Sequence, residues 1–425
     1  MGSMGAVSSH MGPVDPDAFG AGTTAAACDG KGPAIVHWLL TEGRGHADIP
    51  AFLDALCRRL NDAGVPLGRC SLSLNLLHPQ IRAMSYYWRG TGAVEAIERA
   101  HGVETSADYL ASPVAAIMDQ GAEAMRFRLE RLTPPWPYPV LGELRDQGLT
   151  DYAAMAMRFS DGRLNVATFA TGRPGGFSTA DLELIDGMLP AFAAVLELKA
   201  LHRLSTTVLD TYVGRRTGAR ILSGDIRRGT GAALRAVLWQ CDLRGFTALA
   251  DRLPREELIA LLNGYFEVMG GAVEDSDGEI LKFIGDALLA VFPLPDGAAG
   301  ADADRLACGR ALDAAEAALE GMRRLNAERA AWGQPTLRCG IALHLGDVMY
   351  GNIGSPNRLD FTVIGPAVNL VSRIESLCKR LDRPLLASAA VAAGCDDRLR
   401  SLGWHPVRGL AEPVEVYGLA AEPVP

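Results

Sequence analysis

The sequence lacks an excess of basic residues, an apolar run of membrane-spanning length and closely spaced cysteine pairs. Its 41 lysines and arginines are outnumbered by 50 aspartates and glutamates, which gives a net charge of −9. Nucleic-acid-binding proteins usually carry a basic face, so this balance argues against nucleic acid as a partner. The most apolar helical stretch, 188–198, is much shorter than the roughly 20 residues that cross a bilayer. We therefore expect no membrane span.

The eight cysteines are scattered along the chain, and no two of them have the CxxC spacing of a zinc site. Reduced thiols are the simplest expectation, and they favour a cytoplasmic protein. The chain begins without a charged segment followed by an apolar one, so no secretory signal is expected.

At 425 residues the chain is long enough for two or three domains. Gly, Ala, Ser and Pro are frequent in residues 1–32, which are predicted to form a disordered tail. A sensory or dimerisation domain is predicted over 33–198, a helical connector over 199–232, and a second domain over 233–425.

The first of these domains has an alternating pattern of helices and strands. A helix is predicted over 50–63, and strands are predicted over 69–77, 152–159 and 164–171. A long helix follows, with Ser178 or Thr179 as its N-cap. This order and the segment FSTADLELID resemble a GAF-type sensory domain. An unrelated α+β domain that serves for dimerisation is the alternative.

Such a domain is large enough to bind a small-molecule ligand. The candidates for lining its pocket are aromatic side chains at strand spacing: Tyr86, Tyr87, Trp88 and Tyr152. Aromatic residues with this spacing are also common in a plain hydrophobic core.

The first chemical motif is AVLWQCDLRGFT, residues 236–247. Its apolar run predicts a buried strand that carries Asp242 at its end, and Gly245 allows a sharp turn into a helix. A carboxylate here can hold a metal ion. The free N–H groups of Gly245, Phe246 and Thr247 at the helix start can face phosphate oxygens.

The second motif is GEILKFIGDALLAVF, residues 278–292, which predicts a hairpin with Asp286 at its tip. In a βαββ unit the end of the first strand lies beside this hairpin tip. Asp242 and Asp286 would then repel each other unless a divalent cation neutralised them. Two oxygen-ligated ions are the usual device for displacement at phosphorus. Taken alone, Asp286 is also consistent with an ordinary turn.

The third motif is DFTVIGPAVNLVSR, residues 360–373. A strand ends at Gly365, and Pro366 suits the first position of the helix that follows. Asn369 and Arg373 are four residues apart, so they project from one helical face. Arginine offers a planar fork of donors that suits phosphate. The alternative is a solvated helix face.

Together, DLRGFT, KFIGDALLAVF, LRCGIALHLGDVMYGNIGS and DFTVIGPAVNLVSRIES resemble the ordered signature blocks of the class III adenylate and guanylate cyclases. The resemblance covers about 235–419 and implies a ferredoxin-like βαββαβ catalytic domain. With the GAF-like domain before it, the fold class is α+β.

The resemblance also implies the roles of individual residues. Asp242 and Asp286, with the Leu243 carbonyl, would bind two Mg²⁺ or Mn²⁺ ions. Asn369 would orient the ribose, and Arg373 would neutralise charge at the α-phosphate. The weaker candidates for triphosphate contacts are Arg358 and Arg408.

Lys282 and Thr362 occupy the family's base-selecting positions. Adenine presents an acceptor at N1 and a donor at N6, which match a Lys282 ammonium and a Thr362 hydroxyl. Guanine presents a donor at N1, which would face the lysine unfavourably. ATP is therefore the expected substrate, although many adenylate cyclases of the family have Asp where this chain has Thr362.

The expected reaction is conversion of ATP to cyclic AMP and pyrophosphate, regulated by the N-terminal domain. In the family one subunit supplies the metal carboxylates, and its partner supplies the base-selecting, Asn and Arg residues. Because this chain carries both sets, a homodimer with two shared sites is expected. The alternatives are a cyclase for GTP or a pyrimidine triphosphate, and a catalytically silent nucleotide-binding regulator.

Overall fold

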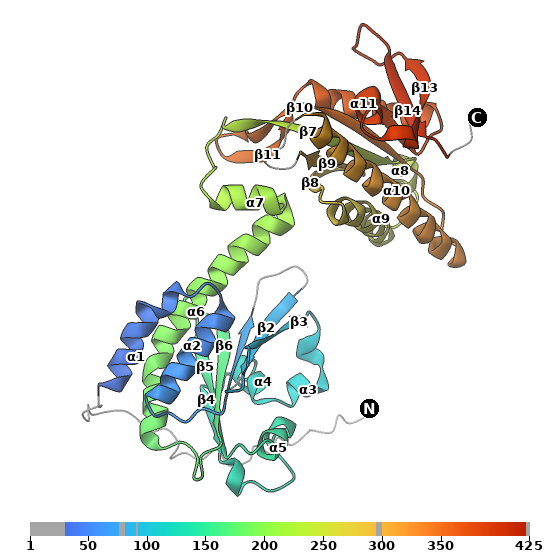
Figure 1. Ribbon diagram of the computed structural model, residues 1–425. Coiled ribbons are helices and arrows are strands. Elements are labelled where there is room, and N and C mark those ends of the chain that lie inside the picture. Colours follow the sequence, from blue (N-terminus) through green and yellow to red (C-terminus); the bar gives the residue numbers. More distant parts are fainter. Residues whose placement is uncertain (1–29, 76–80, 91, 295–299, 422–425) are drawn as a thin grey trace. The chain divides into compact units, whose positions relative to one another are not determined.

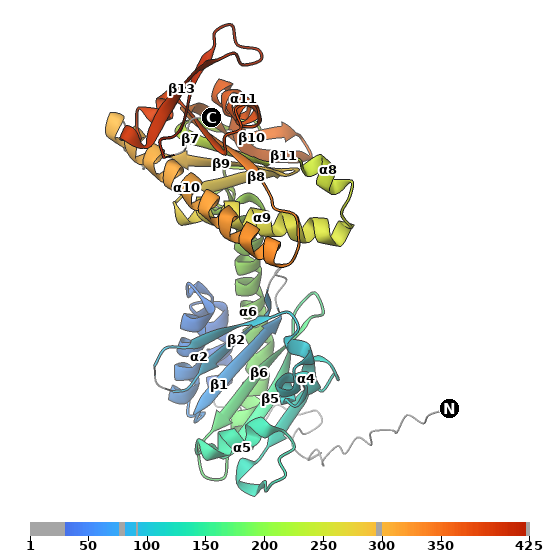
Figure 2. The ribbon, with the colours of Figure 1, turned by 90° about the vertical axis from the view of Figure 1, so that its right-hand side faces the viewer.

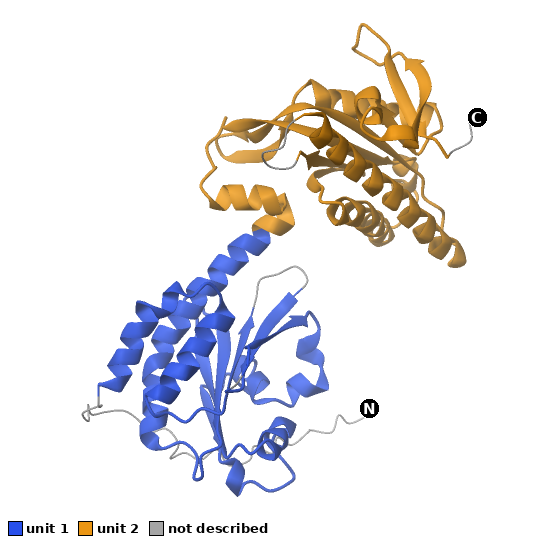
Figure 3. Cartoon of the chain, viewed as in Figure 1, with its two compact units in different colours: residues 1–208 blue, residues 209–425 orange. Residues whose placement is uncertain are grey.

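The computed structural model describes residues 30–75, 81–90, 92–294 and 300–421 (Figures 1 and 2). The chain forms two compact units, residues 1–208 and 209–425 (Figure 3). Most of the tail predicted over 1–32 lies outside the described residues, and the first helix begins at Lys31. The predicted boundaries at 198 and 232 stay a prediction.

The first unit is built on one antiparallel sheet in the order β3-β2-β1-β6-β5-β4. Its strands are β1 (Arg69–Asn75), β2 (Ile81–Trp88), β3 (Glu95–Ala100), β4 (Ala124–Phe127), β5 (Asp151–Arg158) and β6 (Leu164–Thr171). The strands predicted over 152–159 and 164–171 are confirmed, the first with a shift of one residue, and the strand predicted over 69–77 is confirmed as far as Asn75, since 76–77 lie outside the described residues. An α+β unit results. Its GAF-like character stays a prediction.

Helices cover both faces of this sheet (Figure 1). One face packs against α1 (Lys31–Leu40), α2 (Ile49–Asp62) and α6 (Thr179–Val213) in the main hydrophobic core. The short helices α3 (Ala107–Leu110), α4 (Pro113–Met118) and α5 (Pro139–Asp146) follow the sheet's other strands, and α4 and α5 pack in a smaller core. The 3-10 turns of this unit are η1 (Gly43–Gly45), η2 (Val103–Thr105) and η3 (Leu129–Arg131).

Helix α6 begins with a reciprocal cap, at the place where the sequence predicted Ser178 or Thr179 as the N-cap. The Asp181 N–H donates to Ser178 Oγ at 3.2 Å, and the Ser178 N–H donates to the Asp181 carboxylate at 2.7 Å. Ser178 is therefore the N-cap, and the pair satisfies two backbone donors at the helix start.

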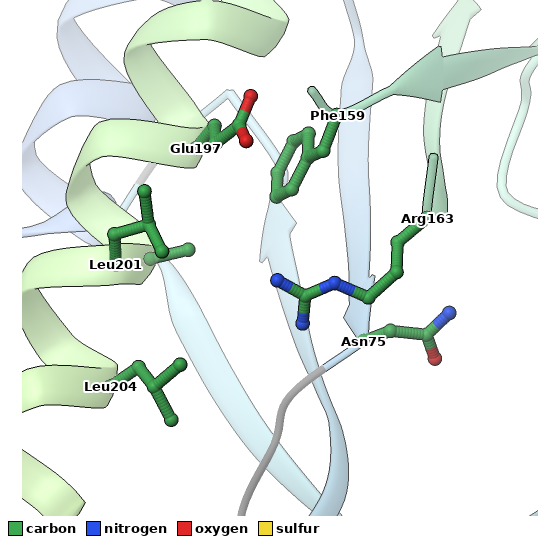
Figure 4. A pocket seen from close by; sticks show the side chains of 7 residues that line it. Asn75, Phe159, Arg163, Glu197, Leu201 and Leu204 are labelled. Carbon is green, nitrogen blue, oxygen red and sulfur yellow. The ribbon is translucent and has the colours of Figure 1, made fainter. Parts of the chain in front are cut away.

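Two hydrogen-bond contacts hold α6 against the β5–β6 turn and against the sheet. Glu197 accepts from the Ser160 N–H at 2.9 Å, and the Arg203 guanidinium donates to the Tyr86 hydroxyl at 3.0 Å. Figure 4 shows the hollow beside the first contact, where Glu197 and Leu201 face Phe159 and Arg163. Its volume of about 10 Å³ has room for about one water molecule and not for an organic ligand.

Strand alternation separates the aromatic residues considered as pocket candidates. Tyr86 and Trp88 belong to the main core under the helices, where Trp88 donates to Asp54 at 2.8 Å. For these two residues the alternative of a plain hydrophobic core is therefore confirmed, because every second residue of a strand points to the same face. Tyr87 and Tyr152 instead line a cavity on the opposite face.

The second unit contains a sheet in the order β13-β14-β12-β10-β7-β9-β8, with β11 paired to β10. Its strands are β7 (Gly231–Leu243), β8 (Glu279–Ile284), β9 (Ala287–Pro293), β10 (Cys339–Ser355), β11 (Arg358–Ile364), β12 (Leu385–Ser388), β13 (Leu399–His405) and β14 (Val414–Leu419). The four strands β10-β7-β9-β8, with their two crossing helices, form the ferredoxin-like βαββαβ core that the sequence predicted.

Helices also cover both faces of this second sheet (Figure 2). On one face lie α9 (Arg255–Asp275) and α10 (Ala301–Ala331), and on the other lies α11 (Pro366–Arg380). The shorter elements are α7 (Arg215–Leu222), α8 (Phe246–Ala250), α12 (Ala389–Ala392) and η4 (Asp396–Arg398).

Helix α7, which lies in the predicted connector, packs onto this second sheet. The buried Glu279 carboxylate accepts hydrogen bonds from the Thr217 N–H and hydroxyl and from the Tyr350 hydroxyl, each at 3.1 Å. The Arg220 guanidinium lies 5.1 Å from the ring centre of Phe361. The segment leading into β7 is thus packed within the second unit, residues 209–425.

Among the described helices, none has both the length and the apolar character needed to cross a bilayer. The seven cysteines within the described ranges are free and buried, and Cys28 lies outside those ranges.

Candidate active site

Asp242 and Asp286 lie side by side at one end of the second sheet. Asp242 is the penultimate residue of β7, and its neighbour Cys241 is paired with Leu288 of β9. Asp286 lies two residues before Leu288, at the tip of the β8–β9 hairpin, where Gly285 has a φ of 64°. The strand register therefore brings the two carboxylates together, as the sequence predicted.

The proximity of these carboxylates has an electrostatic cost. Partial burial raises the pKa of Asp242 to about 6, with a further contribution from hydrogen bonding and charge at Asp286. A cation bound beside the pair would favour the ionised form of the Asp242 carboxyl.

Glu375 is a third acid at this place, and the sequence analysis missed it. Its Oε1 lies 2.8 Å from the position that a Cβ on Gly340 would occupy, and Gly340 is paired with Asp242 across the sheet. Burial, and then the charge of Asp242, raises the pKa of Glu375 to about 7. The signal was present in the motif, because Glu375 follows Arg373 by two residues on α11.

The donor set at Asp242 and Asp286 fits a hard divalent cation. Both ligands are carboxylate oxygens, which Mg²⁺ and Mn²⁺ accept, and their mutual repulsion is relieved by a positive ion. The Leu243 carbonyl belongs to the next residue of β7. Within the described ranges, no group of three or more His, Cys, Asp or Glu side chains is arranged as a metal cage. Water and a phosphate ligand would therefore have to complete the coordination.

The chain turns directly after these ligands into α8. Gly245 has a φ of 76°, a left-handed conformation that favours glycine, and it is the N-cap of this short helix. The N–H groups of Phe246 and Thr247 are at the helix start and have no partner within the helix. Their predicted contact with phosphate oxygens stays a prediction.

Lys282 lies on β8, which pairs with β9, and Thr362 lies on β11, which pairs with β10, so their strands are not hydrogen-bonded to each other. The Lys282 ammonium forms an ion pair with Asp360, which lies two residues before Thr362 and so on the same face of β11. The Thr362 hydroxyl oxygen is buried and has no hydrogen-bond partner in the part of the chain that the structure describes. Asp360 was missed by the sequence analysis, since its partner is 78 positions away.

Asn369 and Arg373 both line a cavity of about 590 Å³ at the start of α11, as their spacing predicted. His344 lines the same cavity, and its Nδ1 lies 2.9 Å from Ser388 Oγ. The Arg373 guanidinium lies against Gly409, with its Nη2 3.1 Å from the position of a Cβ there.

The two weaker arginine candidates are both exposed. Arg408 precedes Gly409 in the loop between β13 and β14, next to the residue that Arg373 contacts. Arg358 is the first residue of β11. Neither lines the cavity around Asn369 and Arg373.

One chain thus carries three groups of candidate residues: paired carboxylates at a strand end, a lysine on β8 with a threonine on β11, and an amide and a guanidinium on one helix face. On a ferredoxin-like sheet, this combination is similar to that of the class III cyclase catalytic domains.

Comparison with known proteins supports that assignment. Residues 236–392 match the family model of the adenylate and guanylate cyclase catalytic domain. An adenylate cyclase of Anabaena cylindrica is 34% identical over 206 residues, which are 46% of this chain and 39% of that protein. Adenylate cyclase 1 of Rhizobium meliloti is 32% identical over 178 residues, which are 41% of this chain and 26% of that protein.

Solved structures in the same class are also similar. The adenylyl cyclase CyaB from P. aeruginosa has 28% sequence identity and a TM-score of 0.41, over 46% of this chain and 97% of that structure. The guanylyl cyclase Cya2 has 28% identity and a TM-score of 0.37, over 45% of this chain and 95% of that structure. This chain spans less than half the length of the two curated cyclases.

Proposed function

We propose that this protein is an adenylate cyclase that converts ATP into 3′,5′-cyclic AMP and pyrophosphate. The observation that carries the proposal is the pair Asp242 and Asp286, held together although burial and repulsion raise the pKa of Asp242 to about 6. Structures maintain such a pair at a functional site more often than for stability.

Asp242 and Asp286, with the Leu243 carbonyl, would hold two Mg²⁺ or Mn²⁺ ions. When bound, the ions supply charge neutralisation at the triphosphate and lower the pKa of a bound hydroxyl. The backbone N–H groups of Phe246 and Thr247 would bind phosphate oxygens at the start of α8.

The residues of α11 then act on the reacting atoms. Arg373 donates to the oxygens of the α-phosphate, where negative charge increases as the ribose 3′-oxygen attacks and pyrophosphate departs. Asn369, one helical turn earlier, holds the ribose so that its 3′-hydroxyl is in line with the bond that breaks. Arg358 and Arg408 are further candidates for the outer phosphates.

Base selection would depend on Lys282 and Thr362. The unpartnered hydroxyl oxygen of Thr362 can accept from the N6 amine of adenine, which would satisfy a buried polar atom. Lys282 can donate to N1 of adenine while Asp360 holds its ammonium in place. Guanine would present a donor to the lysine, so ATP is favoured over GTP.

We further propose a homodimer with two shared sites. Exposed large apolar side chains next to the site residues support an interface: Phe283 (52% exposed) and Ile284 (56%) follow Lys282, and Ile364 (49%) follows Thr362. In this arrangement one protomer supplies the carboxylates, and its partner supplies Lys282, Thr362, Asn369 and Arg373. A cytoplasmic location is part of the proposal, since the described cysteines are free thiols.

Regulation by the first unit is the final part of the proposal. Helix α6 contacts the sheet of that unit through Arg203 and Tyr86, and it continues to Val213, past the boundary at residue 208. A change in this contact could favour one arrangement of the two catalytic domains in the dimer over another. A bias of about 1–3 kcal/mol would alter turnover several-fold to about a hundredfold. Arg203→Gln is expected to change basal turnover. Arg131→Gln, an exposed arginine of the same unit, is the matched control.

The direct test is turnover of the purified protein with ATP, GTP, CTP or UTP, in Mg²⁺ and in Mn²⁺ separately. We expect cyclic AMP as the main product, and loss of turnover by at least about a hundredfold in Asp286→Asn. Asp251→Asn, an exposed position beyond α8, is the control. Preferred use of another triphosphate would identify a cyclase for a different base. Triphosphate binding without turnover in every condition would identify a silent regulator.

A further inference from the structure

The first unit contains a cavity of about 540 Å³ on the face of its sheet opposite α1, α2 and α6. This volume is in the range of about 300–1,000 Å³ that small-molecule sites occupy. The cavity extends from strands β1, β2 and β3 to the helices α3, α4 and α5, all within one unit.

The strand wall of this cavity is polar, although helices cover that side of the sheet. Ser71, Ser85 and Thr168 are all buried and line the cavity, and the Ser71 and Thr168 hydroxyls share a hydrogen bond of 2.6 Å. A covered sheet face is ordinarily apolar, because buried hydroxyls need partners. Here the hydroxyls also border the open volume of the cavity, where a ligand could accept or donate further hydrogen bonds.

Two partly buried arginines stand on the same wall. Arg69 donates to the Gln147 side-chain oxygen at 3.2 Å, while Arg99 donates to the Tyr87 hydroxyl at 3.1 Å. Both partners are neutral. In the described ranges, neither guanidinium has a carboxylate within 4.0 Å. Partly desolvated cations usually have an anionic partner, and this cavity leaves room for one.

A third arginine adds to the positive charge at this place. Arg69 and Arg89 both lie near the ring of Tyr87, at 5.4 Å and 5.6 Å from its centre. Burial, and then the charge of Arg89, lowers the pKa of Arg69. Arg89 is also paired with Glu95. A bound anion would relieve the repulsion between Arg69 and Arg89.

The helix wall of the cavity has a different character. Val114, Met118, Val140 and Leu144, on α4 and α5, present an apolar surface to the cavity. The acidic residues of the lining also belong to this side: Glu104, Asp108 and Glu143. The Glu104 carboxylate accepts from the Gly102 N–H at 3.0 Å. The cavity therefore has its guanidinium groups on the strands and its apolar surface on the helices.

We propose that this cavity binds a small organic anion, a carboxylate or a phosphate ester, whose charged group contacts Arg69 and Arg99 and whose apolar body lies against α4 and α5. Such a ligand satisfies the arginines and the strand hydroxyls at once, and its apolar body fills the side of the cavity formed by α4 and α5.

The test measures binding to the full chain by calorimetry with matched probes. Indole-3-acetate and indole-3-acetamide differ only in the charge of the group that the arginines would contact, and phenyl phosphate replaces the carboxylate by a phosphate. We expect at least one of the two anions to bind with one molecule per chain, and the amide to bind about tenfold more weakly or worse. The anion that binds more tightly identifies the preferred charged group.

Variants assign the binding to this cavity. Arg69→Gln and Arg99→Gln should each weaken anion binding about tenfold or more, whereas the amide should be unaffected and Arg131→Gln should match the wild type. Thermal unfolding of each variant checks that it is folded. Equal binding of acid and amide overturns the proposal, as does binding of neither anion at millimolar concentration or anion binding that survives both substitutions. Since no turnover is measured, these outcomes are independent of the proposed cyclase activity.

Discussion

The carboxylate of Glu375 lies over Gly340, close enough that a Cβ on this glycine would be 2.8 Å from the Glu375 Oε1. Gly340 is also the partner of Asp242 across strands β7 and β10. The absence of one side chain therefore brings an acid of α11 next to the paired carboxylates. In this way α11 connects the Asn369 and Arg373 group to the carboxylates of the same chain.

Substitution of Gly340 by Ala tests whether this approach matters. The added methyl group would lie 2.8 Å from Glu375 Oε1 and 2.9 Å from Cys378 Cβ, so both Glu375 and α11 must shift, and we expect turnover to fall about tenfold or more. The measurement is kcat with ATP, together with circular dichroism to check the fold. Gly309→Ala is the control, since a Cβ there meets nothing within 4 Å, and it should leave turnover unchanged.

Mixed dimers test the shared site. Asp242→Ala and Arg373→Ala should each be inactive, and mixing them should restore part of the activity because one of the two sites in the mixed dimer is intact. Activity is followed after subunit exchange has been verified with differently tagged chains. Absence of recovery in verified mixed dimers would contradict the shared site. It would mean that Asp242, Asp286, Asn369 and Arg373 of one site come from a single chain.

Base selection can be tested at the ion pair. Lys282→Glu replaces a donor to adenine N1 by an acceptor and places a second carboxylate beside Asp360, so turnover of ATP should fall about a hundredfold or more. The ratio of kcat/KM for ATP to that for GTP is the relevant quantity, and Lys379→Glu, exposed at the end of α11, is the control. An unchanged ratio would mean that Lys282 does not contact the base.

His344 predicts a pH dependence of stability. Burial lowers its pKa to about 4, whereas a histidine in an unfolded chain has a pKa of about 6.5. Between about pH 6.5 and pH 4, His344 is therefore protonated in the unfolded state and remains neutral in the folded state. The free energy of unfolding then decreases as pH falls towards 4, by at most about 1.4 kcal/mol per pH unit from this group.

The variant His344→Gln should lose this part of the dependence. Urea unfolding at several pH values between 8 and 4.5 measures the free energy of unfolding of both proteins. As pH falls, the wild type should lose more of this free energy than the variant does. Parallel profiles for the two proteins would contradict the prediction.

The sequence predicted the positions of site residues best where the local residue pattern and the order of the strands lead to the same placement. Asp242 at a strand end and Asp286 at a hairpin tip are adjacent because the βαββ connection leaves little choice. Asn369 and Arg373 share a cavity because their spacing is one helical turn. These placements could be predicted from the repeat of the helix and from the order in which strands and helices follow along the chain.

Other features depend on contacts between distant segments. The ion pair of Lys282 with Asp360 joins two strands that are far apart in the sequence, and Glu375 reaches the carboxylates only because residue 340 has no side chain. Alternation along β2 separates Tyr86 and Trp88 from Tyr87, but spacing alone does not tell which face of the strand borders a cavity. The docking of α7 depends on Thr217 meeting a buried glutamate, which no local pattern indicates.

The attachment of α7 to the second sheet has a consequence for selectivity. Thr217 holds Glu279 on the strand that carries Lys282, and Arg220 lies on Phe361, the residue before Thr362. The two residues that we propose as base-selecting, Lys282 and Thr362, are therefore both connected to the same short helix. We expect a rotation of α7 that repositions one strand to reposition the other as well, so that a signal arriving through this helix would alter the choice of nucleotide together with the rate.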